Sequence, residues 1–346
     1  MKPKFDKKRL ITSVVSAIIL IIFMLIVYKY RQNETVSFNE TAFVMGTVFQ
    51  VNLSSAQKGD DPSGELVNIG NRLERNLLSW RLDSSEIAKI NASAGKAEGY
   101  ELSPDMEEIL TECLRISAES DGAFDITVGP LTRLWDIDGW ASGEKQGEFV
   151  PPDKTEIEKA LSLCGYDKVE IRDHRIYMQE GMSIDLGAVG KGIYLDKCRD
   201  YLDQGNALSG VIVAGGSVLT VGDKKDGTDW NVGITDPFKD GELIGHIEVE
   251  PWKSVSTSGS YERFVEYEGM RYHHILDPKT GYPAEKGNAS VTIVSQSGLI
   301  SDALSTACFM LDTEEAVELA ERMGAEICII AEDGTVSGNI KLIKIK

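Results

Sequence analysis

The sequence has few histidines and cysteines, and it lacks the short motifs that mark several common enzyme classes. Four histidines and five cysteines occur in 346 residues. The cysteines are Cys113, Cys164, Cys198, Cys308 and Cys328. Their odd number and the absence of a C-x-x-C pair argue against a zinc site and a disulfide framework, and we expect buried free thiols. No G-x-S-x-G or H-E-x-x-H motif occurs, which argues against the common hydrolase and zinc-peptidase sites.

Positive charge is scarce outside the N-terminal segment. The whole chain has a formal net charge of −19, and because residues 1–31 carry +6, the remainder carries −25. A body this acidic repels phosphate backbones, so a nucleic-acid partner is not expected. An anionic small ligand would need a local cation to hold it.

One long uncharged stretch lies near the N-terminus. Residues 10–28 contain no charged side chain, and a helix of that length is enough to cross a hydrocarbon core of about 30 Å. The stretch lacks the small-residue cleavage site of a secretory signal, and no cysteine follows it for lipid attachment. Basic residues on its N-terminal side predict that this end is cytoplasmic. We therefore expect a basic tail at 1–9, a transmembrane anchor at 10–28, a linker at 29–40 and an extracytoplasmic domain at 41–346 of a single-pass protein of the cell membrane.

The main part of the chain predicts an α+β fold, with mixed sheets and flanking helices. Composition is that of a globular protein, with 42% hydrophobic and 26% charged residues. Residues 43–53 alternate as one strand, and the glycine of Met45-Gly46-Thr47 in its middle predicts a bulge or a close backbone approach. Helical and strand patterns mix without a regular β-α-β repeat, which favours α+β over a doubly wound sheet.

A glycine-rich loop runs from Gly187 to Gly192 and includes Lys191. It matches neither the Walker A spacing nor the dinucleotide fingerprint. A strand that leads into such a helix start favours anions, because bare N–H groups and the helix dipole attract negative charge. Lys191 either adds the cation that the acidic body lacks or is an exposed lysine beside a permissive turn. Asp185, just before the loop, is either a ligand for a metal or substrate or a helix cap.

Asp302 and Thr306 stand one turn apart on one face of an otherwise apolar predicted helix. A buried acid there needs a partner. A carboxylate, a hydroxyl and a loop carbonyl are oxygen ligands that suit Mg²⁺. An acid on the helix surface fits the spacing equally well.

His273 and His274 are adjacent at a probable strand end. Imidazole titrates near neutrality, so His274 is a candidate general base or phosphate clamp. The alternative is a hydrogen-bonded strand-end histidine, and the residues alone do not show which of the two histidines is catalytic.

Seven motifs occur in a specific order between Met45 and about Leu311. They are MGT at Met45, GAFDITVGPL at Gly122, DLGAVGKG at Asp185, AGG at Ala214, TSGSYER at Thr257, HHILDPKTG at His273 and SDALSTA at Ser301. Each is weak alone, but the ordered set resembles the ApbE-type FAD:protein FMN transferases.

This resemblance implies a set of site residues. The FAD site would be lined by Met45, Trp80, Ala123, Phe124, Asp125, Asp185, Lys191 and the backbone of Leu276. Mg²⁺ would be held by the Ala188 carbonyl, Asp302 and Thr306. His274 resembles the catalytic histidine of the family, which leaves a structural role for His273. The chain departs from the family at Trp80, where tyrosine is frequent, although both rings stack on a flat ligand. It also has a predicted membrane anchor where many members carry a lipobox cysteine. This difference changes how the protein is attached to the membrane and not its chemistry.

The resemblance further implies an enzyme that uses FAD as substrate and Mg²⁺ as cofactor. It would transfer the FMN moiety to a threonine or serine hydroxyl on a subunit of a redox membrane protein and release AMP. Two alternatives remain open at this point. One is a Mg²⁺-dependent FAD pyrophosphatase that forms FMN and AMP, and the other is a flavin-binding protein without catalysis.

Overall fold

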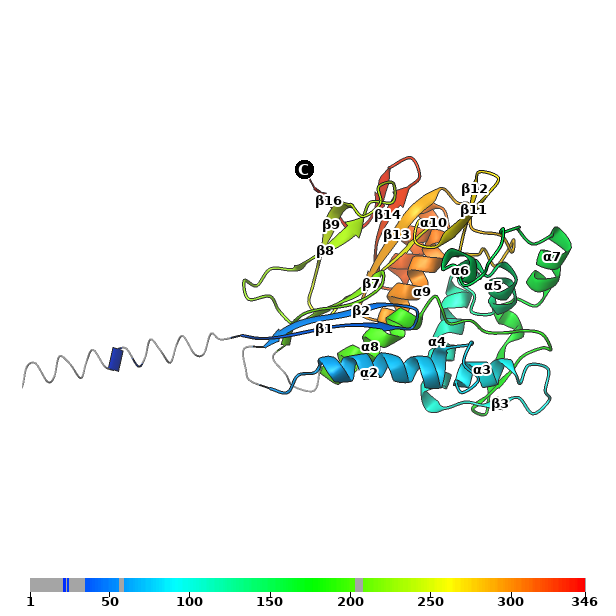
Figure 1. The fold of residues 1–346 in the computed structure, drawn as a ribbon, viewed down its shortest axis with the longest axis horizontal. Helices are drawn as coiled ribbons and strands as arrows, with labels where there is room; N and C mark the ends of the chain where they lie inside the picture. The colour runs from blue at the N-terminus through cyan, green and yellow to red at the C-terminus, as the bar shows by residue number, and fades with distance from the viewer. Residues whose placement is uncertain (1–20, 23, 25–34, 56–58, 203–207, 346) are drawn as a thin grey trace, which may run out of the picture.

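An eight-stranded antiparallel sheet forms the centre of the fold in the computed structural model (Figure 1). Its strand order is β1-β2-β6-β7-β10-β13-β14-β15. The strands are β1 (Val36–Val44), β2 (Thr47–Ser55), β6 (Leu208–Ala214), β7 (Ser217–Val221), β10 (Ser254–Gly259), β13 (Asn288–Ser295), β14 (Glu326–Ala331) and β15 (Val336–Gly338). The predicted α+β class is confirmed, and neighbouring strands of this sheet run antiparallel throughout.

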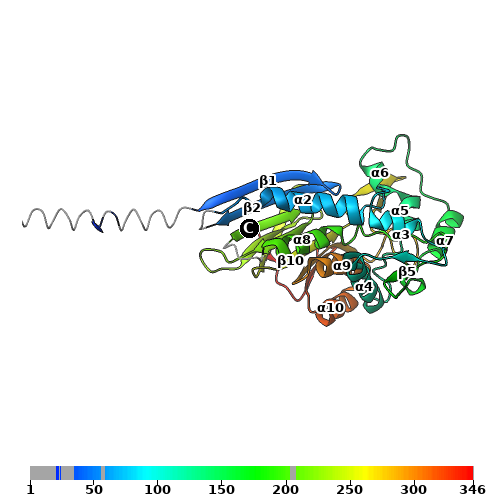
Figure 2. The ribbon, with the colours of Figure 1, turned by 90° about the horizontal axis from the view of Figure 1, so that it is seen from below.

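Helices cover one face of this sheet. They are α2 (Ser63–Leu73), α8 (Gly190–Leu202), α9 (Gly298–Phe309) and α10 (Thr313–Arg322), and α4 (Pro104–Glu119) packs against α9 (Figure 2). Phe49 of β2 stacks on Tyr194 of α8 with ring centroids 4.2 Å apart. The same ring lies against the backbone of Gly70 in α2, where an added Cβ would come within 2.6 Å of it. The glycine therefore allows α2 to approach the sheet closely.

A small sheet covers part of the opposite face. Its order is β16-β9-β8, formed by β16 (Ile343–Lys344), β9 (Leu243–Val249) and β8 (Trp230–Thr235). Ile247 and Val232 of this sheet share a hydrophobic cluster with Val255, Val294 and Ile330 of the central sheet. Because side chains alternate along a strand, the neighbours of Val255 in β10 point to the helical face. Strand β10 thus packs against the small sheet with one face and against the helices with the other.

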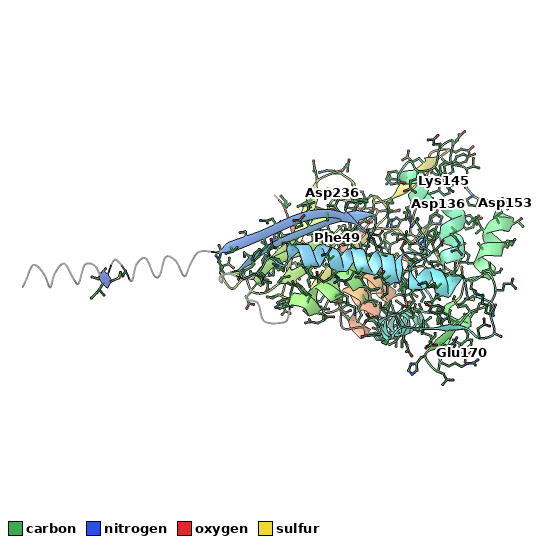
Figure 3. The ribbon with its side chains drawn as sticks, turned by 60° about the horizontal axis from the view of Figure 1, so that its bottom comes forward. Phe49, Asp136, Lys145, Asp153, Glu170 and Asp236 are labelled. Atoms are coloured by element: carbon green, nitrogen blue, oxygen red, sulfur yellow. The ribbon has the colours of Figure 1, made fainter. Side chains whose placement is uncertain are left out.

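A second region packs around its own core at one end of the molecule. It contains α5 (Gly129–Trp135), α6 (Ile137–Ala141), α7 (Lys154–Ser162) and the hairpin of β11 (Phe264–Tyr267) and β12 (Met270–His273). Trp135 is 1% exposed at its centre, and its indole nitrogen donates to the Gly281 carbonyl at 2.8 Å. Figure 3 places Asp136, Lys145 and Asp153 at this end, where Lys145 Nζ lies 2.9 Å from Asp136. This packing attaches the loop after the histidine pair to α5 and α7.

The remaining elements are short. They are a π-helical turn (Glu74–Leu78), α3 (Glu86–Asn91), β3 (Tyr100–Glu101), a 3-10 turn (Tyr166–Lys168), β4 (Glu170–Arg172) and β5 (Arg175–Tyr177). Strands β3, β5 and β4 form a small antiparallel sheet.

Two predicted boundaries near the N-terminus are wrong. Residues 43–53 are not one strand with a bulge but parts of a hairpin, in which Met45 and Gly46 form the turn and Val44 faces Thr47. Both turn residues have positive φ, 54° and 70°, as a two-residue hairpin turn requires. The linker predicted at 29–40 is also too long, because β1 begins at Val36. The first residues of β1 were assigned to the linker because they are largely polar, and they are polar because β1 is an edge strand with one face in solvent.

The structure describes residues 21–22, 24, 35–55, 59–202 and 208–345. The tail predicted at 1–9 and most of the anchor predicted at 10–28 lie outside the described residues; within the anchor, only Ile21, Ile22 and Met24 are described, and they are helical. Within the described ranges, no helix has the length and apolar character needed to span a membrane.

Candidate active site

The first turns of α8 and α9 touch through two glycines. A Cβ at Gly192 would lie 2.0 Å from the Gly298 carbonyl oxygen, and one at Gly298 would lie 2.3 Å from that of Gly192. Asp196 of α8 holds the start of α9, since its carboxylate accepts from Gly298 N at 2.7 Å and from Leu299 N at 2.9 Å. This close crossing places Lys191 of α8 beside Asp302 of α9.

Asp302 is 2% exposed and is surrounded by donors. Its carboxylate accepts from the Gly192 backbone N–H at 3.0 Å and from Ser217 Oγ at 3.3 Å. Lys191 Nζ lies 3.3 Å from Asp302 Oδ1. The buried charge is thus paired and hydrogen-bonded, as a buried carboxylate requires. Sequence spacing left a surface acid open as the alternative, and burial excludes it.

A row of hydroxyls from β10 faces α9. Ser256 Oγ lies 2.9 Å from Ser301 Oγ, and Ser258 Oγ lies 2.8 Å from Ser305 Oγ and 3.4 Å from Thr306 Oγ1. These serines alternate with Val255, so they point to the helical face of the sheet. Thr306 therefore stands one helical turn from Asp302 in a polar seam between sheet and helix.

His274 follows β12 and is held by one carbonyl group. The Arg263 carbonyl oxygen accepts from His274 N at 3.1 Å and lies 3.2 Å from His274 Nδ1. Since a carbonyl only accepts, we assign the ring proton to Nδ1. This leaves Nε2 with a lone pair that can take a proton.

The electrostatic surroundings of His274 favour its neutral form. Desolvation by the surrounding protein, and then the Arg263 charge, lower the pKa of His274 well below its ordinary value, with a smaller contribution from Lys191. Glu262, beside the same cluster, has its pKa raised by desolvation although Lys191 opposes the shift. A half-buried imidazole that stays neutral at neutral pH is suited to act as a base.

His273 has different surroundings. It is 6% exposed, its Nε2 donates to the Ala284 carbonyl at 2.9 Å, and its Nδ1 accepts from the Ile275 N–H at 3.3 Å. The ring packs edge-on against Phe309 of α9. Both nitrogens are therefore engaged with the backbone, which fits the structural role expected of His273.

Trp80 lies next to two arginines, and these three residues form one wall of the candidate site. The Arg81 guanidinium carbon is 4.2 Å and that of Arg133 is 5.9 Å from the Trp80 ring centroid. Asp185 belongs to the same group of charges: burial raises its pKa, while the Gly187 N–H at 2.8 Å and the Arg81 charge oppose the shift. The wall combines a flat ring with cations, which suits a flat ligand that carries phosphates.

The segment with Ala123, Phe124 and Asp125 lies beside Asp185, whose backbone N–H donates to the Ile126 carbonyl at 2.8 Å. Ala123 and Phe124 are 4% and 2% exposed and belong to the main core. Asp125 Oδ1 accepts from Thr127 N and Oγ1, both at 2.7 Å, and Oδ2 accepts from Tyr166 N at 2.9 Å. Asp125 therefore fixes the loop, and contacts of Ala123 and Phe124 with a ligand are expected through backbone atoms.

Met45 and Leu276 are the remaining residues predicted to contact FAD. The Met45 methyl group lies 3.1 Å from the position of a Cβ at Gly190, so the hairpin turn contacts the start of α8. Leu276 forms an antiparallel bridge with Pro283, flanked by hydrogen bonds from Ala284 N to Ile275 O and from Asp277 N to Tyr282 O. In this pattern the N–H and C=O of Leu276 point away from the partner segment, free for a ligand.

The described residues offer oxygen donors for a hard cation. Among them, no three His, Cys, Asp or Glu side chains gather as a metal site. A cation at the predicted position would thus rely on the Asp302 carboxylate and the neutral oxygens of Thr306 and Ala188. Oxygen-only donors with a single carboxylate fit Mg²⁺, which often keeps several waters.

Four charged residues were missed by sequence reasoning. They are Arg81, Arg133, Glu262 and Arg263. Glu262 and Arg263 lie within the TSGSYER motif, and Arg133 closely follows GPLT, so their positions beside recognised motifs were the available signal. The sequence does not show which of these charged side chains lie close together, because that depends on long-range packing.

Fold and site together define a flavin transferase family. The ApbE family model matches residues 45–329, and the chain belongs to this family. The predicted enzyme assignment is confirmed by its relatives: the chain is 31% identical to the FAD:protein FMN transferase of Treponema pallidum, with 88% of each chain covered. It is 36% identical to that of Klebsiella pneumoniae, with 69% of this chain and 72% of the relative covered.

Solved structures show the same fold. The ApbE protein of Thermotoga maritima superposes with a TM-score of 0.78 and 32% identity, covering 88% of this chain and 97% of that one. The apo flavinyl transferase ApbE of Pseudomonas stutzeri gives 0.74 and 29%, with 88% and 95% covered. The roles assigned to individual site residues stay predictions.

Proposed function

We propose that this chain transfers the FMN moiety of FAD to a threonine or serine hydroxyl of a partner protein, with Mg²⁺ as cofactor, and releases AMP. The observation that carries the proposal is the convergence on one site of a neutral imidazole, His274, with the Lys191–Asp302 pair. The relatives' name, FAD:protein FMN transferase, supports the substrate and the acceptor class.

His274 supplies the proton acceptor in this proposal. The acceptor hydroxyl gives its proton to His274 Nε2 as its oxygen attacks the phosphorus on the FMN side. A new phosphoester bond forms, the pyrophosphate P–O bond breaks, and AMP leaves with the electron pair. Positioning contributes much of the rate in such phosphoryl transfers.

The start of α8 binds the pyrophosphate. Lys191 provides the cation, and the bare N–H groups of the glycine-rich loop provide donors. Asp302, Thr306 and the Ala188 carbonyl would hold Mg²⁺, which neutralises pyrophosphate charge when bound. Trp80 stacks on a flat ring of FAD, with Met45, Asp185 and the Leu276 backbone on the neighbouring walls.

The partner and the location are further parts of the proposal. A single-pass anchor at 10–28 with a cytoplasmic basic tail places the catalytic domain outside the cytoplasm, on the cell membrane. The acceptor is then a subunit of a redox membrane protein with its hydroxyl on the same side.

One experiment separates this function from its alternatives. The full chain is incubated with FAD, Mg²⁺ and membrane protein from source cells that lack the enzyme, and a denaturing gel is examined for flavin fluorescence. Transfer yields fluorescent protein bands and AMP. Free FMN and AMP without labelled protein would instead identify a pyrophosphatase, and unchanged FAD would identify a binding protein.

A further inference from the structure

A cavity of about 550 Å³ lies beside His273 and is separate from the predicted FAD wall. Strand β12 forms one side, residues 282–288 form the other, and His273 and Ser260 belong to its lining. None of the residues predicted to contact FAD or Mg²⁺ lines it. The cavity therefore offers space at His273, one residue before His274, that FAD binding does not account for.

One edge of β12 is open to this cavity. The hairpin has only two strands, and Tyr267 pairs with Met270 across a two-residue turn. In this pairing Met270 and Tyr272 direct their backbone groups to β11, while Arg271 directs its N–H and C=O to the other edge. Within the described part of the chain, no strand pairs with that edge. An open edge is a template for an extended polypeptide.

The lining combines apolar anchors with carboxylates. Met270 and Tyr282 are 58% and 42% exposed, which is high for large apolar side chains. Glu285 and Glu332 also line the cavity, and among the described residues neither carboxylate has an ion pair. The cavity's cation, Arg271, lies over the Phe264 ring with its guanidinium carbon 4.0 Å from the centroid and faces Glu266. The surface therefore favours an apolar segment with a basic side chain.

We infer that this cavity is the docking site for the acceptor polypeptide, which lies extended along β12 and places a basic side chain at Glu285 and Glu332. The inference rests on the proposed function. His274 directly follows the last residue of β12, and successive residues of a strand advance about 3.3 Å. A polypeptide that lies along β12 and continues past its end therefore runs toward His274.

Charge reversal tests the inference. The variant Glu285→Lys/Glu332→Lys is compared with Glu108→Lys/Glu318→Lys, which makes the same change of net charge on exposed helix positions of α4 and α10. Initial rates of flavin incorporation are measured with the full chain against graded concentrations of membrane protein from source cells that lack the enzyme. We expect the half-saturating concentration to rise about tenfold in the first variant alone, with the maximal rate and FAD affinity unchanged.

Cross-linking provides a second measurement. A photoreactive benzoylphenylalanine replaces Met270, or, as the control, Leu243 of β9, which is also a large exposed apolar residue. Light should join the Met270 variant to the flavin-labelled protein, at a residue within about ten positions of the labelled hydroxyl, and the Leu243 variant should give no such adduct. The inference would be overturned by an unchanged half-saturating concentration in the Glu285→Lys/Glu332→Lys variant, or by a cross-link far from that hydroxyl. In either case, labelling by the unaltered chain would still support the transferase function. A lack of labelling by the unaltered chain would overturn the proposed function and the docking site together.

Discussion

The Arg263 carbonyl accepts hydrogen bonds from both the backbone nitrogen and the Nδ1 of His274, at 3.1 and 3.2 Å. The Arg263 side chain is itself held, since its Nη1 lies 2.9 Å from each carboxylate oxygen of Asp138 in α6. One residue thus fixes the backbone, the tautomer and the electrostatic environment of the candidate base. The ion pair connects that base to the region formed by α5–α7.

Replacement of His274 by alanine should abolish flavin transfer. Loss of a general base costs roughly 10²–10⁴-fold in rate, whereas FAD binding should persist because the cations lie elsewhere. The measurement is gel fluorescence of the acceptor together with quenching of FAD fluorescence on binding. His246→Ala on β9 is the control, and full transfer by the His274 variant would rule out its catalytic role.

The pH dependence should reveal the charge of Arg263. Because burial and this cation lower the pKa of His274, the unaltered enzyme should lose activity only at a pH below the ordinary histidine range. Arg263→Gln removes the cation, so the pKa should rise and the acid limb of the kcat profile should move to higher pH. At pH values well above the acid limb, kcat should change less.

Two matched variants separate this effect from general damage. Arg322→Gln removes another exposed ion-paired arginine, on α10, and should leave the profile in place. Asp138→Asn keeps the Arg263 charge but loosens its anchor, so it should lower kcat across the pH range without moving the limb upward. An acid limb that stays fixed in Arg263→Gln would contradict the electrostatic argument.

Lys191→Met should weaken FAD binding. A charge-assisted contact to phosphate is worth about 1.5–3 kcal/mol, which corresponds to roughly ten- to hundredfold in Kd. The Kd from flavin fluorescence should also depend less on salt in this variant. Lys197→Met, one and a half turns along α8, is the control, and equal Kd values for the two variants would argue against pyrophosphate contact by Lys191.

Thr306→Val should raise the Mg²⁺ concentration needed for half-maximal activity, because it removes a hydroxyl while retaining the branched shape. Thr306→Ser keeps the oxygen and should behave like the unaltered enzyme. Mg²⁺ titration of the transfer rate is the measurement. The same Mg²⁺ requirement in all three proteins would exclude Thr306 as a ligand.

Gly192→Ala should destabilise the fold strongly. The new methyl group would lie 2.0 Å from the Gly298 carbonyl oxygen, and both partners are backbone that cannot rotate away. Overpacking of this kind costs about 1–3 kcal/mol or more. Gly64→Ala in α2 meets nothing within 4 Å and should stabilise by about 0.5–1 kcal/mol. Urea unfolding measures both, and equal midpoints would show that the α8–α9 crossing is not tight.

Much of the architecture was accessible from local sequence signals. Ser103-Pro104 and the Asp153–Glu156 capping box mark helix starts that the structure contains. Local patterns also placed Lys191 at the head of a helix. The Met45-Gly46 turn was missed because its glycine was interpreted as a bulge within one strand. A hairpin partner that is largely polar carries little strand signal.

The meeting of Asp302 with Lys191 could not be read from spacing. It depends on two glycines 106 positions apart that let α8 and α9 touch, and an isolated glycine in a helix carries no such information. Arg263 was missed for a related reason. It fixes the backbone and tautomer of His274 through its carbonyl group, and every residue type supplies a carbonyl, so side-chain patterns do not mark that part of its role.

The hairpin of β1 and β2 has a consequence for which proteins can be labelled. Met45, at its tip, is nine residues beyond the start of β1 at Val36, a rise of roughly 30 Å along the strand. If residues 10–28 cross the membrane, the seven residues before β1 add at most about 25 Å. The strand is then a stalk of limited height, which keeps the hairpin tip at Met45 within about 55 Å of the lipid surface and so limits how far out the site beside it can reach. A target whose hydroxyl stands farther out would escape labelling, whatever its sequence.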